Sequence, residues 1–143
     1  MTDAAQGTTM LEYSVMAIRR DASGSTASAH DASIDLDTSV EGRAAALNPA
    51  ETLLAALAAC MIKGAERSRP MIHVEYRGLE VRLHAVRRDS PPAIVSIDYE
   101  LIVDSDEPDH RLELLHTNVR KYGTVSNTLA AAVTLTGTVR RKA

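Results

Sequence analysis

The chain has 143 residues, and 16 Lys and Arg against 19 Asp and Glu leave a net charge of −3 at pH 7. This length is typical of one domain that folds without a disulfide or a metal. The acidic balance argues against a nucleic-acid partner, which usually requires a basic face. No apolar run reaches the ~20 residues of a membrane span, so no membrane partner is expected.

The ends and the single cysteine indicate where the protein works. The first nine residues are small and polar, which predicts a flexible tail over residues 1–9 and one domain over residues 10–143. They lack the basic and apolar regions of a secretory signal. One cysteine excludes an intramolecular disulfide and is compatible with a reducing compartment. We therefore expect a cytoplasmic protein.

The first third of the chain favours a β-hairpin. Residues 10–20 alternate apolar and polar side chains, which predicts a strand. Residues 21–26 (DASGST) have the composition of a turn. A weaker alternation over residues 27–39 predicts the second strand, and an Ala-rich connector over residues 41–47 follows.

A long helix is predicted from Asn48 to about residue 68. Asn48 is a favourable N-cap, Pro49 suits the first helical position, and Glu51 stands three residues after the cap, where a capping box requires a carboxylate. The Arg-Pro pair at residues 69–70 is expected to end the helix. An apolar stripe recurs at helical spacing along it: Leu53, Leu54, Leu57, Cys60, Met61 and Gly64.

The second half of the chain predicts a long antiparallel hairpin and then two helices and a strand. Residues 73–85 and 93–103 alternate on either side of a proline turn, and a slip of the apolar register at Gly78 predicts a β-bulge there. A helix is expected after residues 105–108, with Gly123 as its end. Its buried stripe is expected to comprise Leu112, Leu115, Val119 and Tyr122. A short helix over residues 126–132 and a strand over residues 133–140 complete an α+β chain.

Cys60 has two readings from the residues alone. Free cysteine is commonly a small buried hydrophobe, and this one lies too far from the helix N-terminus for the helix dipole to activate it. A reactive thiolate would need a cation from elsewhere in the fold, such as Arg19, Arg20 or Arg43.

The five histidines show no metal-ligand spacing with Cys60 or with each other, so no metal and no cofactor is expected. We expect His84, His110 and His116 to be exposed to solvent.

Two segments resemble the signatures of the OsmC/Ohr family (osmotically inducible protein C and organic hydroperoxide resistance proteins). They are NPAETLLAALAAC, residues 48–60, and KYGTVSNTL, residues 121–129. The resemblance implies the OsmC-like fold, with antiparallel sheets and a long central helix in an intertwined homodimer. It also implies an organic hydroperoxide reductase, in which Cys60 attacks the peroxide and an arginine of the N-terminal strands, matched by Arg19 or Arg20, holds the thiolate.

The sequence departs from the family pattern at two positions. The family's resolving cysteine is matched by Gly123, and its helix-start glutamate by Ala50, with Glu51 next to it. Three readings follow. One is a one-cysteine peroxidase that takes an external thiol as reductant. Another is a non-catalytic dimer that binds an apolar ligand in a pocket lined by Leu57, Met61 and Glu51. The third is a structural dimer with Cys60 in its core.

Overall fold

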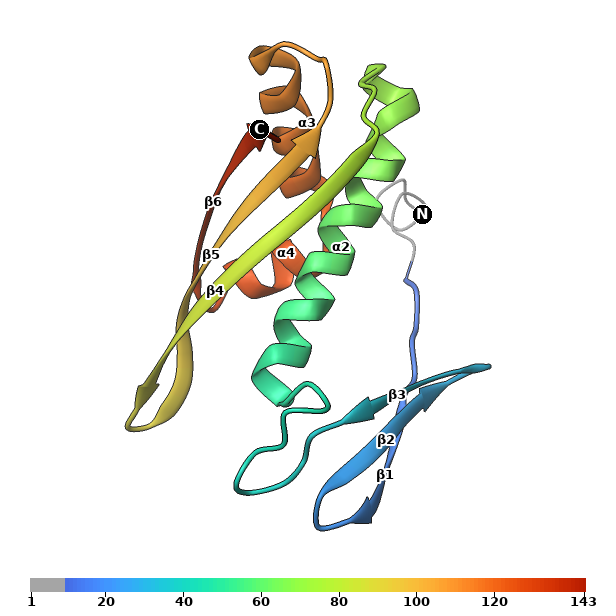
Figure 1. Ribbon diagram of the computed structural model, residues 1–143, viewed down its shortest axis with the longest axis vertical. Coiled ribbons are helices and arrows are strands. Elements are labelled where there is room, and N and C mark those ends of the chain that lie inside the picture. The colour runs from blue at the N-terminus through green and yellow to red at the C-terminus, as the bar shows by residue number, and fades with distance from the viewer. Residues whose placement is uncertain (1–9) are drawn as a thin grey trace, which may run out of the picture. The chain divides into compact units, whose positions relative to one another are not determined.

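The computed structural model describes residues 10–143, and the tail expected over residues 1–9 lies outside the described residues. Its internal contacts divide the chain into two compact units, with the boundary between Thr52 and Leu53. Each unit has a three-stranded sheet (Figure 1). The prediction of one domain over residues 10–143 stays a prediction.

The sheet of the N-terminal unit is an antiparallel meander of β1 (Met16–Asp21), β2 (Gly24–Ala29) and β3 (Ala32–Leu36). The expected two-strand hairpin was therefore wrong in number and bounds. The region predicted as one turn already contributes Gly24 and its neighbours to β2. A second turn at residues 30–31 divides the segment predicted as one strand, and there His30 adopts a left-handed φ of 45°. Histidine and aspartate tolerate such turn conformations, but they are weaker turn signals than glycine or proline.

The central helix α2 (Pro49–Ile72) extends beyond its predicted end, and Pro70 lies inside its last turn. Pro70 is exposed, so water can bond the carbonyl that its missing N–H would have bonded. The helix instead ends at Ile72 and is followed by His73, whose φ of 54° is left-handed. Arg111 reaches this end and donates hydrogen bonds to the carbonyl oxygens of Ile72 and His73.

The sheet of the C-terminal unit contains the predicted hairpin. β4 (Gly78–Asp89) pairs antiparallel with β5 (Pro92–Asp104), and β6 (Thr134–Arg141) pairs parallel with β5. The register shift lies between Val86 and Arg87, not at Gly78, because residues 73–77 precede the strand and are not part of it. Parallel strands need a long connection, and the two helices between β5 and β6 provide it. They return the chain to the end of the sheet at which β5 begins.

The helices α3 (Asp109–Tyr122) and α4 (Thr124–Ala130) connect β5 to β6. Tyr122 was predicted to be buried but is 51% exposed, because the α3 stripe that packs inward ends one turn earlier, at Val119. No helix among residues 10–143 is long and apolar enough to cross a membrane. The core combines residues of α2, β5 and α3: Leu57, Met61, Ala65, Ile97, Tyr99, Leu101, Val103, Leu112, Leu115 and Val119.

Candidate functional site

Cys60 lies at the margin of the buried face of α2. Leu57 and Met61, which flank it in the helix, have no exposed surface and belong to the core, whereas Cys60 is a half-buried free thiol. A helix turns by about 100° per residue, which places Cys60 about 60° from Leu57 and about 100° from Met61 around the axis. Cys60 therefore keeps part of its surface exposed, whereas its two neighbours do not.

Gly64, one turn after Cys60, packs closely against α3. A Cβ added to Gly64 would lie 3.7 Å from the Cα atom of Val119, an ordinary van der Waals distance, so the two helices are in contact at this point. The face of α2 that carries Cys60 thus leads to the C-terminal end of α3, where Gly123 stands.

Gly123 joins α3 to α4 at a place with no room for a side chain. An added Cβ would lie 2.9 Å from the carbonyl oxygen of Val119 and 2.9 Å from Oγ of Ser126. Ser126 is fully buried, and its hydroxyl has no hydrogen-bond partner among the described residues. The position that matches a resolving cysteine is therefore closed by packing as well as occupied by glycine.

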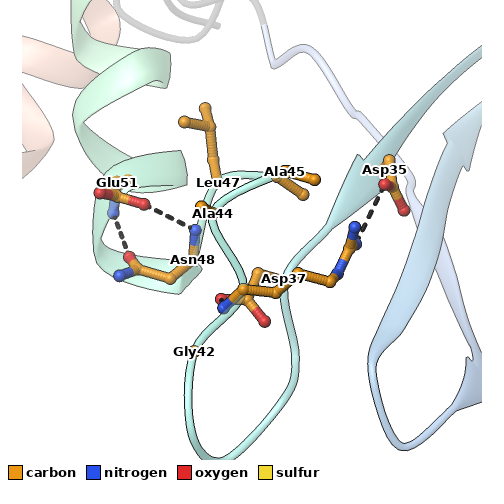
Figure 2. Close-up of a pocket in the computed structure, with 10 residues that line it drawn as sticks. Asp35, Asp37, Gly42, Ala44, Ala45, Leu47, Asn48 and Glu51 are labelled. Carbon is orange, nitrogen blue, oxygen red and sulfur yellow. Dashed lines mark hydrogen bonds and ion pairs between the residues drawn. The ribbon is translucent and has the colours of Figure 1, made fainter.

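The start of α2 forms the predicted capping box. The amide N–H of Glu51 donates to Oδ1 of Asn48 (2.8 Å), and the amide N–H of Asn48 donates to Oε1 of Glu51 (3.0 Å), as Figure 2 shows. The Glu51 carboxylate is thereby held at the helix start, where the positive end of the dipole favours it.

An open pocket of about 610 Å³ lies between this helix start and the loop after β3, within the N-terminal unit. Glu51 lines it, whereas Leu57 and Met61 do not. Its other charged lining residues are Asp35, Asp37 and Arg43. The sequence does not predict this grouping, because Asp35 lies in β3 and the other two residues lie at separate points of the loop that follows. Figure 2 shows Asp35 across from the capping box and Asp37 between the two.

The carboxylates of this pocket are already engaged. Asp37 accepts hydrogen bonds from the hydroxyl and amide of Ser39 and from the amide of Arg43 (2.7 Å), and these bonds hold its pKa below the usual range. Asp35 pairs with Arg43 (3.1 Å) and Arg20 (2.5 Å). The pocket wall is thus a bonded loop whose charges largely neutralise each other.

The two arginines expected beside the thiol differ in their surroundings. Both lie at the end of β1, in the N-terminal unit, whereas Cys60 lies in the C-terminal unit. Arg20 is paired with Asp35, whereas Arg19 forms no ion pair within residues 10–143. Arg19 therefore has the freer guanidinium of the two.

A second polar cluster lies in the C-terminal unit, where His116 contradicts its predicted exposure. Its side chain is only 15% exposed, and Nε2 lies 2.6 Å from the hydroxyl of the buried Tyr99. The prediction failed because His116 is at the boundary of the α3 stripe, and the helical pattern alone does not reveal that a tyrosine of β5 reaches it. Within residues 10–143, no three His, Cys, Asp or Glu side chains are grouped so as to hold a metal ion.

The fold and the placement of Cys60 define a class: a small α+β protein with one thiol on a long, Asn-capped central helix. A family model described as OsmC-like protein matches residues 41–137, and the chain belongs to this family. None of the curated proteins searched matches the chain.

Solved structures support the fold. An OsmC-like protein from Mycoplasma pneumoniae has a TM-score of 0.85 at 20% identity, over 94% of this chain and 100% of that one. An organic hydroperoxide resistance protein OsmC from Legionella pneumophila has a TM-score of 0.72 at 14% identity, over 92% and 98%. The organic hydroperoxide resistance protein OhrB of Bacillus subtilis has a TM-score of 0.64 at 18% identity, over 91% and 98%. The expected OsmC-like α+β fold is thereby confirmed.

Proposed function

We propose that this protein reduces organic hydroperoxides through Cys60, with an external thiol as reductant, in defence against oxidative stress. The observation that carries the proposal is the position of Cys60, half-buried at the edge of the apolar face of the central helix. A peroxidatic thiol must meet a small substrate and still be shielded from bulk solvent. Membership of the OsmC-like family and the names of the two hydroperoxide resistance proteins above support the same chemistry.

The reaction balances with two external thiols. The Cys60 thiolate attacks one oxygen of the hydroperoxide, the O–O bond breaks, and the other oxygen leaves with a proton as an alcohol. Cys60 is oxidised to a sulfenic acid. One external thiol then displaces water and forms a mixed disulfide, and a second thiol releases Cys60 and leaves as a disulfide.

The external reductant follows from Gly123. The described structure leaves no space there for a side chain, and the chain has no second cysteine. The sulfenic acid therefore needs a thiol from another molecule, which a reducing cytoplasm supplies, and we place the protein there.

Arg19 is our choice for the cation that stabilises the thiolate. It forms no ion pair within residues 10–143, whereas the charge of Arg20 is shared with Asp35. We infer that Arg19→Gln lowers the rate of peroxide reduction more than Arg20→Gln. Equal losses in the two variants would contradict this assignment.

We further propose a homodimer, which the N-terminal sheet supports. Ile18 and Ile34 lie on opposite faces of this sheet by register, and both are more than half exposed. A sheet with apolar side chains exposed on both faces is expected to be covered by another chain. Light scattering that gives the mass of one chain at micromolar concentration would exclude the dimer.

The alternative is a non-catalytic dimer that binds a small apolar ligand. Its support is that Ala50 replaces the family glutamate and that the neighbouring carboxylate, of Glu51, is bonded in the capping box. On this alternative Cys60 merely lines a pocket, with Leu57, Met61 and Glu51 as the other expected contacts.

One experiment separates the two functions. Consumption of an alkyl hydroperoxide in the presence of dithiothreitol is measured for the wild type and for Cys60→Ser, and the oxidised wild type is treated with a sulfenic-acid trap. We expect turnover only with Cys60 and one trapped adduct, on Cys60. Turnover that does not depend on Cys60, or no turnover, would refute the peroxidase. In that case saturable binding of an apolar fluorescent probe, weakened by Cys60→Trp, would favour the binding module.

A further inference from the structure

We propose that the pocket between α3 and α4 binds a phosphate-type oxyanion, with Arg120 and Lys121 as its principal donors and the His116 ring in its wall. The pocket is lined by His116, Thr117, Arg120, Lys121 and Asn127. Thr117 donates its hydroxyl to the Glu113 carbonyl and Asn127 donates an amide N–H to the Lys121 carbonyl, so the two cations are the main donors for a ligand. No carboxylate lines it, although the chain has 19 Asp and Glu. The site lies in the C-terminal unit and does not depend on the chemistry proposed for Cys60.

The cations of this pocket lack ion-pair partners within the described residues. Neither Arg120 nor Lys121 has a carboxylate oxygen within 4.0 Å there, and the Nζ atom of Lys121 lies 5.3 Å from the ring centre of Tyr122. Elsewhere in the same structure eight arginines are paired: Arg20, Arg43, Arg69, Arg77, Arg82, Arg87, Arg140 and Arg141. An acidic chain thus leaves two adjacent cations unpaired beside a pocket.

Basic residues in the last turn of a helix also complement its dipole, which by itself would account for positive charge at this end of α3. The arrangement of Arg120 goes beyond that role. Burial raises the pKa of Tyr99 and lowers the pKa of His116. The charge of Arg120 opposes the first shift and adds to the second. Arg120 and His116 both line the pocket, one helical turn apart on α3.

Tyr99 fixes the His116 ring in the wall of this pocket. The Tyr99 ring lies directly over Gly137 of the neighbouring strand, where a Cβ would overlap the ring. Burial raises the pKa of Tyr99 to about 12, so the phenol stays protonated, and its hydroxyl shares a hydrogen bond with Nε2 of His116. The other ring nitrogen, Nδ1, lies 3.8 Å from the carboxylate of Glu113. The ring is therefore a fixed part of the pocket wall, which reduces the entropic cost of binding.

The charge and geometry favour a compact oxyanion with several acceptor atoms. A planar guanidinium binds phosphate through two parallel N–H donors, and an ammonium can reach the remaining oxygens. A phosphate monoester and free phosphate share this chemistry. A carboxylate has only two oxygens and would leave donors unused.

The test is a titration followed by the ring resonances of His116 in the NMR spectrum. Inorganic phosphate, phenyl phosphate and acetate are added separately at constant ionic strength to the wild type, to Arg120→Gln and to Arg88→Gln. Arg88 is the matched control, because it also lacks an ion pair within residues 10–143 but lies at the end of β4. We expect saturable shifts with a phosphate, at least about tenfold weaker binding in Arg120→Gln, and unchanged binding in Arg88→Gln.

The two phosphates identify the source of the ligand. Tighter binding of phenyl phosphate assigns the pocket to a monoester, and tighter binding of inorganic phosphate assigns it to the free ion. Three results would overturn the proposal. They are shifts that do not saturate, equal weakening in the two arginine variants, or acetate binding as tightly as phosphate. Arg120→Lys keeps a charge without the planar fork and is expected to bind with intermediate affinity.

Discussion

Replacing Gly123 by alanine measures how firmly the structure excludes a second cysteine. The new Cβ would lie 2.9 Å from a main-chain oxygen, that of Val119, and 2.9 Å from Oγ of Ser126, both closer than side-chain carbons approach other atoms. Overfilling a packed site of this kind costs about 1–3 kcal/mol. Restriction of the unfolded chain by alanine offsets about 0.4–1 kcal/mol. We therefore expect Gly123→Ala to lower the free energy of unfolding by about 1–2 kcal/mol.

Gly78→Ala is the control that separates the two effects. Its Cβ would meet only the Cβ of Asp104, at an ordinary 3.8 Å, so the unfolded-state effect remains without the clash. The free energy of unfolding is obtained from urea titrations by circular dichroism. The difference between the two variants should be about 1–3 kcal/mol in favour of Gly78→Ala.

A coupled variant tests the cause. Ser126→Ala removes one of the two contacting oxygens and a buried hydroxyl without a partner among the described residues, so it should leave stability unchanged or increase it. In that background Gly123→Ala should cost less, but not nothing, because the Val119 oxygen remains. Equal stability of Gly123→Ala and Gly78→Ala would refute the steric argument. Packing would then not require a glycine at position 123.

Three further outcomes are expected. Asn48→Ala removes the helix cap and should cost about 1 kcal/mol in urea unfolding; no loss would show that the capping box does not stabilise α2. Arg111→Gln removes the guanidinium from the C-terminal carbonyls of α2 and should cost about 1–2 kcal/mol, against less than about 0.5 kcal/mol for Arg88→Gln. Burial lowers the pKa of His116 below 6.5, so the unfolded chain binds the proton more readily and stability falls as the pH decreases below about 6.5. His116→Gln, which can still accept from Tyr99, should reduce this fall between pH 7 and pH 5, and identical pH profiles would contradict it.

Local patterns were sufficient where neighbouring residues decide the structure. The capping box depends on Asn48 and Glu51 alone, and the structure forms it as predicted. The hairpin of β4 and β5 follows from clean alternation around a proline turn. The family resemblance, carried by the two segments around Cys60 and Gly123, is confirmed by the match to residues 41–137.

Local patterns failed where a distant residue changes the outcome. Pro70 predicts a helix end, yet the helix continues to a left-handed His73 whose carbonyl is bonded by Arg111, 38 residues later in the chain. The bulge predicted at Gly78 occurs at Val86, because the pairing with β5 determines where β4 begins. Tyr122 follows the stripe of α3 but lies beyond the part that packs against the core.

The sequence by itself determined the α+β class, the central helix with its cap, the single thiol and the family, because these depend on short-range spacing and on motifs. Only the tertiary structure revealed that Cys60 lies at the margin of the buried face rather than in the core, that Gly123 has no room for a side chain, and that Tyr99 holds His116 beside an unpaired arginine. Each of these facts depends on the distance between atoms of different elements. Periodicity assigns a residue to a face, and packing decides what that face touches.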